Sequence, residues 1–303
     1  MTDARLSRHR LWVDGDGARI AALRWGDATD RPAALLLHGT SFVAETWDEI
    51  AHGLADRYTV YALDRRGHGA SDKPGRYHFV DFARDVCATI EALDLSGIYG
   101  IGHSAGATDL LLAAKLLPER FSRLFVMEPT IMDPAAYPGD DARLSDQSAA
   151  SVQGVLRRQS EFASAEAAYQ RYRAAPAFAQ WTDVALRAYI AHGFQPLPDG
   201  RVQLLCRPEI EAAMLLPIFE AMEQVYRGDH SGNPFGWLGE IGCPVRIATA
   251  ETSWSVYKEM ASRATRLMPA ASRMMFGGVG HCVAQEAPAL VLQALHAFAA
   301  ETA

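Results

Sequence analysis

The strongest constraint on the fold is a five-residue run, GHSAG at residues 102–106, which lies between a short apolar segment and an Ala/Leu-rich one. The apolar segment at 98–101 is typical of a buried strand, and residues 105–117 are typical of a helix that ends before Pro118. Small residues at both ends of the run allow a sharp strand-to-helix turn from which the Ser104 side chain projects. A strand leading directly into a helix favours a parallel sheet.

The alternation of strand and helix patterns extends over much of the chain. Further apolar runs, typical of strands buried on both faces, lie at 33–37, 58–63, 123–127, 245–250 and 272–276. Helical patterns are expected at 79–93, at about 254–267 and from about 286, and the DGDG turn between 10–13 and 19–25 predicts an N-terminal hairpin. The expected fold class is therefore α/β, a mostly parallel eight-stranded sheet flanked by helices.

The alternation stops between residues 131 and 240. That segment is mostly helical in pattern, with candidate helices at about 145–158, 165–174, 182–193 and 209–226, and a short strand at 202–206. We expect residues 1–130 and 241–303 to form the core and 131–240 to be an inserted helical cap. The basic pair Arg157-Arg158 within it is interpreted as part of a solvated helix face.

The composition excludes several classes of partner. A net charge of −7 over 303 residues argues against a nucleic-acid partner. The chain has no apolar run of membrane-spanning length, no apolar signal-peptide region and no C-x-x-C among its four cysteines. We expect a cytoplasmic enzyme with a small-molecule substrate, no nucleic acid, no membrane and no metal or organic cofactor. A homodimer is left open.

Ser104 needs a base, because a serine hydroxyl is a poor nucleophile by itself. His281 is the favoured candidate, since it follows the last expected strand on the glycine-rich loop 277–280, which can bring its imidazole over the sheet edge. His103, beside Ser104, is a candidate for the pocket lining. The HGT run at 38–40 predicts an oxyanion hole formed by the backbone N–H groups of Thr40 and Ala105.

Four runs carry a family resemblance. LLLHGTS, DRRGHGASDKP, GHSAG and GGVGH follow one another in this order and together resemble the α/β-hydrolase superfamily. The resemblance spans most of the core and implies an α/β-hydrolase fold with Ser104 as nucleophile and a helical cap after the sixth strand. It gives Asp64 a structural role, with Arg65 or Arg66 as its partner. It says little about substrate, because this fold hosts many chemistries.

The acid that completes a triad is the least obvious member. The family usually takes an Asp from the loop after the penultimate strand, where this chain has Ser253. A second location in the superfamily is the end of the strand after the nucleophile, here Glu128, as in zearalenone-type lactonases and one group of haloalkane dehalogenases. Adjacent parallel strands lie about 5 Å apart, which favours Glu128. Glu251 and Asp133 are the alternatives.

These expectations combine into a function. We expect a serine hydrolase that cleaves a medium-sized, largely apolar ester or lactone through an acyl-enzyme, with Phe42, His103 and Trp254 in its pocket. The alternatives are a C–C bond hydrolase or lyase on the same fold, and a non-catalytic ligand-binding member. Dehalogenase and epoxide hydrolase chemistry are disfavoured, because those families use an Asp nucleophile where this chain has Ser104.

Overall fold

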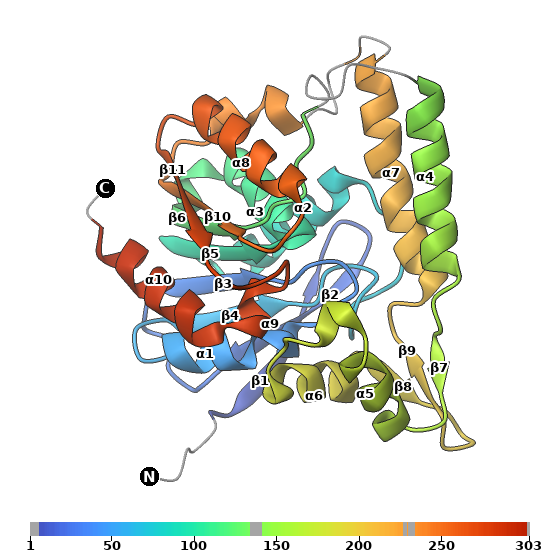
Figure 1. The fold of residues 1–303 in the computed structure, drawn as a ribbon. Helices are drawn as coiled ribbons and strands as arrows, with labels where there is room; N and C mark the ends of the chain where they lie inside the picture. The colour runs from blue at the N-terminus through green and yellow to red at the C-terminus, as the bar shows by residue number, and fades with distance from the viewer. Residues whose placement is uncertain (1–5, 134–140, 227–228, 230–233, 302–303) are drawn as a thin grey trace.

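An eight-stranded sheet forms the centre of the protein in a computed structural model that describes residues 6–133, 141–226, 229 and 234–301 (Figure 1). Its spatial order is β1-β2-β4-β3-β5-β6-β10-β11. The first two strands run antiparallel to their neighbours, and the rest pair in parallel, so the expected mostly parallel eight-stranded sheet is confirmed. The strands are β1 (Arg8–Asp14), β2 (Arg19–Trp25), β3 (Ala33–Leu37), β4 (Thr59–Leu63), β5 (Ile98–His103), β6 (Phe121–Met127), β10 (Val245–Ala250) and β11 (Ala271–Phe276).

Strand β3 shows why the parallel strands read as continuous apolar runs. All five of its residues are buried. Leu35 and Leu37 point into the hydrophobic cluster on one face of the sheet, whereas Ala34 and Leu36 point into the cluster on the other. Since successive side chains of a strand face opposite sides, a strand covered on both faces needs an apolar residue at every position.

Helices cover both faces of this sheet (Figure 1). One cluster takes residues from α2, α3 and α8, and the opposite cluster takes residues from α1, α9 and α10. None of the helices in the described part of the chain is long and apolar enough to cross a bilayer. The helical elements of this part are η1 (Ala44–Trp47), α1 (Asp48–Leu54), α2 (Phe79–Ala92), α3 (Ala105–Leu116), η2 (Pro118–Arg120), α8 (Ser255–Leu267), α9 (Val283–Glu286) and α10 (Pro288–Ala300).

Between β6 and β10 the chain leaves the main sheet. This segment carries a small antiparallel sheet of order β7-β9-β8, and helices α4 and α7 lie side by side (Figure 1). Its elements are α4 (Asp141–Leu156), β7 (Glu161–Phe162), α5 (Ala165–Arg173), η4 (Pro176–Phe178), α6 (Asp183–His192), β8 (Phe194–Pro196), β9 (Val202–Leu204), α7 (Pro208–Tyr226), η5 (Pro234–Gly236) and η6 (Leu238–Glu240).

An aromatic cluster joins the inserted segment to the loops of the main sheet. Tyr172, Trp181 and Tyr189 of the insertion pack in one hydrophobic cluster with Phe42, which follows β3, and Cys282, which follows β11. The insertion thus lies over the loops at the carboxyl ends of two parallel strands. The division of the chain at residues 130 and 240 stays a prediction.

Candidate active site

The turn between β5 and α3 holds Ser104 in a left-handed backbone conformation, with φ 53° and ψ −124°. Both glycines of the run are needed for close packing. A Cβ on Gly102 would lie 2.6 Å from the Cα of Ala107, and one on Gly106 would lie 2.4 Å from the carbonyl oxygen of His38. The Ser104 N–H donates to the Met127 carbonyl of the neighbouring strand at 2.9 Å, which holds the turn in place.

Left-handed backbone is concentrated around this turn. Four described residues other than glycine have a positive φ, namely Ser41, Asp94, Ser104 and Glu128. Three of them belong to the loops that follow β3, β5 and β6, which are neighbours in the sheet. Each such residue costs about 1–3 kcal/mol and persists only where its surroundings enforce it, a pattern common at functional sites.

Glu128 lies directly beside His281. Its side chain is fully buried, and its Oε2 lies 2.7 Å from the His281 Nδ1. The same oxygen accepts the Ser253 hydroxyl at 2.5 Å, and Oε1 accepts the Ala250 N–H at 2.8 Å. These donors offset the cost of burying a carboxylate. Ser253 stands where the family usually has an Asp. It follows β10 and donates its hydroxyl to Glu128, which follows the adjacent strand β6.

The two alternative acids face elsewhere. Glu251 is exposed and accepts the Gly278 N–H at 2.8 Å, so it caps the glycine-rich loop. Asp133 pairs with Arg263 of α8 at 3.1 Å. Of the three candidates, Glu128 contacts the imidazole.

Tyr257, which sequence reasoning missed, connects His281 to Ser104. Its ring stacks on the His281 ring, with centroids 4.8 Å apart and planes at 20°. Its hydroxyl faces the side chains of Ser104 and Thr130, whose hydroxyl oxygens are 3.3 Å apart. Burial raises the pKa of Tyr257 to about 12, so the phenol stays neutral. No motif marks Tyr257, which lies in the first turn of α8.

The backbone N–H groups of Thr40 and Ala105 have no hydrogen-bond acceptor in the described part of the chain. The loop after β3 passes against the turn that carries Ser104, since a Cβ on Gly39 would lie 3.1 Å from the Ser104 Cβ. Ala105 is the first residue of α3, so its N–H has no acceptor within the helix. Neither N–H donates a hydrogen bond to any described residue. They are therefore available to a developing oxyanion.

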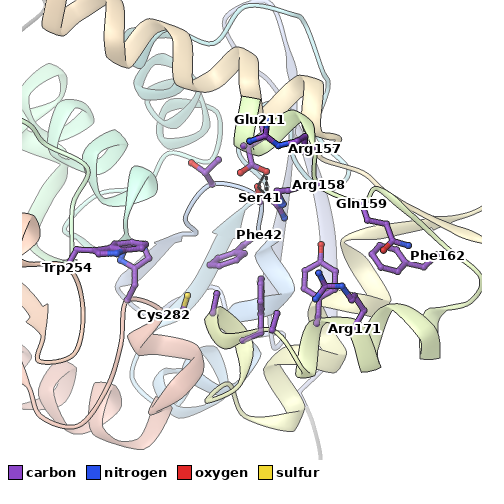
Figure 2. Close-up of a pocket in the computed structure, with 17 residues that line it drawn as sticks. Ser41, Phe42, Arg157, Arg158, Gln159, Phe162, Arg171, Glu211, Trp254 and Cys282 are labelled. Atoms are coloured by element: carbon purple, nitrogen blue, oxygen red, sulfur yellow. Dashed lines mark hydrogen bonds and ion pairs between the residues drawn. The ribbon is translucent and has the colours of Figure 1, made fainter. Parts of the chain in front are cut away.

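A cavity of about 660 Å³ opens beside Thr40 and His281 (Figure 2). Thr40, His281 and Cys282 line it, together with Phe42 and Trp254, the two aromatic residues expected there. Trp254 is 65% exposed, and its ring centroid lies 5.4 Å from that of His281. Burial raises the pKa of Cys282 to about 12, which leaves its thiol protonated and a poor nucleophile.

His103 lies beneath the site instead of in the cavity lining. It is 1% exposed, and its Nε2 lies 2.8 Å from the backbone carbonyl of His281. Burial, followed by the neighbouring His281, holds the pKa of His103 well below its ordinary value, so the ring is neutral. A neutral ring donates one N–H to the carbonyl. His103 therefore supports the loop that carries His281, which corrects the expectation of a pocket residue.

The cavity lining carries several charged side chains, whereas a pocket for a largely apolar substrate is expected from the sequence. Arg157, Arg158 and Arg171 of the inserted segment line the cavity, with Glu211 as the acid among the described lining residues. The pair Arg157-Arg158 was expected on a solvated helix face. Helix α4 ends at Leu156, so the pair instead lies on the connection to β7, where the chain passes the cavity.

The DRRGHG turn has the structural role expected for Asp64, with different partners. The Asp64 carboxylate accepts the backbone N–H groups of Ala44 and Ala70, both at 2.8 Å. The arginines beside it pair with other acids. Arg65 binds Asp109 at 2.5 Å, and Arg66 binds Asp85 at 2.6 Å.

Comparison with known proteins identifies the family. The sequence profile described as "Alpha/beta hydrolase family" matches residues 34–294. The chain belongs to this family. The hydrolase is 28% identical over 269 residues to 2-(acetamidomethylene)succinate hydrolase of Mesorhizobium japonicum, covering 88% of this chain and 87% of that protein. It is 38% identical over 122 residues to a non-heme chloroperoxidase of Streptomyces lividans, covering 39% of this chain and 44% of that protein.

Solved structures agree on the fold. E-2-(acetamidomethylene)succinate hydrolase superposes on this hydrolase with a TM-score of 0.77 at 23% identity, covering 97% of this chain and all of that one. The thioesterase domain from the curacin biosynthetic pathway gives a TM-score of 0.74 at 20% identity, covering 96% and 99%. At these identities the likeness shows the α/β-hydrolase fold alone, as expected from the four sequence runs.

Proposed function

We propose that this protein is a serine hydrolase that cleaves a carboxylic ester or lactone through an acyl-enzyme, with Ser104, His281 and Glu128 as its triad. The observation that carries the proposal is the 2.7 Å contact between Glu128 and the His281 Nδ1. Ser104 supports it, because its left-handed turn is hydrogen-bonded to Met127, the residue before Glu128. A carboxylate at Nδ1 keeps the proton on that nitrogen. The Nε2 is then unprotonated and can act as a base.

The reaction proceeds in two steps. Ser104 attacks the carbonyl carbon while His281 takes the hydroxyl proton, and the N–H groups of Thr40 and Ala105 stabilise the oxyanion. When the tetrahedral intermediate collapses, the C–O bond to the leaving alcohol breaks and His281 protonates that alcohol. A water molecule then attacks the acyl-enzyme with His281 again as base, which releases the carboxylic acid and restores Ser104.

A second candidate keeps this machinery and changes the bond. The relative that aligns over most of this chain is named 2-(acetamidomethylene)succinate hydrolase. The compound in that name contains no ester group. A C–C or other non-ester bond next to a carbonyl is the corresponding alternative here. The third candidate, a non-catalytic ligand-binding member, requires the same pocket without turnover.

A substrate panel on the wild type and Ser104→Ala tests the proposal. Aryl esters, lactones and vinylogous diketones are compared, with the exposed Ser151 of α4 replaced by alanine as the matched control. We expect turnover of esters or lactones that falls by at least about 10³-fold in Ser104→Ala and is unchanged in Ser151→Ala.

Two results would contradict it. Turnover of diketones alone would favour the second candidate. Failure of a serine-directed phosphonate to label the wild type at Ser104 would refute the serine nucleophile, whatever the substrate.

A further inference from the structure

The cavity beside His281 carries more positive charge than the chain as a whole would suggest. Its described lining residues include three arginines and one acid, whereas the whole chain has a net charge of −7. All three arginines come from the inserted segment. The groups proposed for catalysis come from the main sheet and its loops.

One of these arginines already has a partner. Arg158 forms an ion pair with Glu211 of α7, and Glu211 Oε2 also accepts the Ser41 hydroxyl at 2.5 Å. The pair therefore neutralises itself and ties α7 to the loop after β3. Breaking it to bind an anion would leave Glu211 without its counter-ion, so Arg158 is a poor candidate for a substrate contact.

Arg157 and Arg171 have no such partner among the residues that the structure describes. Neither forms a side-chain hydrogen bond or an ion pair with any described residue, and both are exposed at the cavity. They lie on different elements, Arg157 after α4 and Arg171 on α5. An unpaired guanidinium can bind a carboxylate through two parallel hydrogen bonds without losing an existing ion pair.

Arg171 lies across the cavity from the residues around His281. Trp254, which contacts His281, and Arg171 lie at opposite sides of Figure 2, and Phe42 lies between them. Phe42, Phe178 and Tyr172 provide aromatic lining. The volume of about 660 Å³ suits a molecule of moderate size that reaches from one side to the other.

We propose that the substrate carries a carboxylate at the end remote from the scissile bond, and that Arg157 and Arg171 bind it. The inference rests on the proposed function, since that function places the reacting carbonyl beside His281. An apolar portion of the substrate lies against the aromatic lining, and the remote charge contributes binding energy that holds the carbonyl at Ser104. The substrate class is therefore an ester or lactone of a dicarboxylic acid with one carboxylate free.

Two aryl esters of matched length test this inference. The mono-p-nitrophenyl ester of glutaric acid has a free carboxylate, and p-nitrophenyl pentanoate has a methyl group in its place. We expect the wild type to prefer the glutarate ester by at least about 10-fold in kcat/KM, because hydrogen bonds to charged groups are individually strong. The preference should weaken between about 0.05 and 0.5 M salt as the charges are screened.

Charge-removing variants assign the effect to the two arginines. In Arg157→Gln/Arg171→Gln the ratio of the two kcat/KM values should fall to about one, since hydrogen bonding to the charged carboxylate is lost. Arg187→Gln is the control, because Arg187 lies on α6, pairs with Asp183 and is not among the described lining residues. A wild type without a preference, or a double variant that keeps it, overturns the inference and leaves the serine hydrolase intact.

A binding measurement separates the inference from the proposed function if neither ester is cleaved. Ser104→Ala is titrated with glutarate in a calorimeter, beside the same variant with both arginines replaced by glutamine. Binding that disappears with the arginines supports the anion site even where the esterase proposal fails. Absence of glutarate binding to Ser104→Ala overturns it.

Discussion

Replacing Glu128 by glutamine changes one carboxylate oxygen into an NH₂ group with almost no change in volume. The carboxylate now accepts from the Ala250 N–H, the Ser253 hydroxyl and His281. The hydroxyl can rotate and become an acceptor, but the backbone N–H cannot. The amide oxygen of the variant should therefore stay at Ala250 and its NH₂ should face the His281 Nδ1.

In that arrangement the imidazole must accept at Nδ1 and carry its proton on Nε2, where it cannot take the Ser104 proton. The flipped amide would restore the productive tautomer but leave the buried Ala250 N–H without an acceptor, at a cost of about 1–3 kcal/mol. The variant also loses the negative charge that stabilises the imidazolium. Together these losses predict a fall of about 10³- to 10⁴-fold in kcat/KM, or about 4–5.5 kcal/mol of transition-state stabilisation.

The assay is kcat/KM on an activated ester for Glu128→Gln and for Glu251→Gln, with thermal unfolding to show that both variants fold. Glu251 is exposed and binds the Gly278 N–H, so its variant should lose less than about 3-fold, as surface substitutions usually do. A larger loss in Glu251→Gln, or a Glu128→Gln enzyme within a factor of ten of wild type, would show that the acid has been misassigned.

Two further changes probe residues around the site. Tyr257→Phe removes the hydroxyl that faces Ser104 and keeps the ring that stacks on His281. If the hydroxyl helps to position Ser104, kcat/KM should fall by about 3- to 10-fold; unchanged kinetics would count against a role for the hydroxyl. Burial, followed by the charge of Asp64, raises the pKa of Glu45 from 4.5 to about 7. Its favourable contribution to folding is therefore present below pH 4.5 and is lost as the pH rises towards 7, so the Tm of Glu45→Gln minus that of wild type should increase from about pH 5 to about pH 8. A constant difference would contradict this.

The main sheet could be predicted closely because burial on both faces leaves a continuous apolar run. Strands β3 and β10 begin and end where their runs do. Strands β7 and β8, with two and three residues, are too short to show a period. Helix α1 was also missed, because its seven residues, DEIAHGL, place few apolar side chains in two turns.

The site shows which signals a sequence carries. Ser104 and His281 stand in local motifs, and Glu128 follows from the neighbour relation of two strands, so the sequence is enough to single out these three. Tyr257 and Arg171 lie on helices with no motif, and their position at the site depends on how those helices pack. A charge can be read from a sequence, whereas the direction in which a connecting loop presents it cannot.

Residues 41, 104 and 128 of this hydrolase have left-handed backbone, which lowers folding stability. At 104 and 128 the side chains are also those proposed for catalysis. Glycine adopts such a conformation without the steric penalty that serine and glutamate carry. Substitution by glycine at position 104 or 128 would relax the chain and delete a side chain proposed for catalysis in the same step. Selection for thermal stability alone would therefore favour glycine at these two positions, and glycine cannot take the proposed catalytic roles.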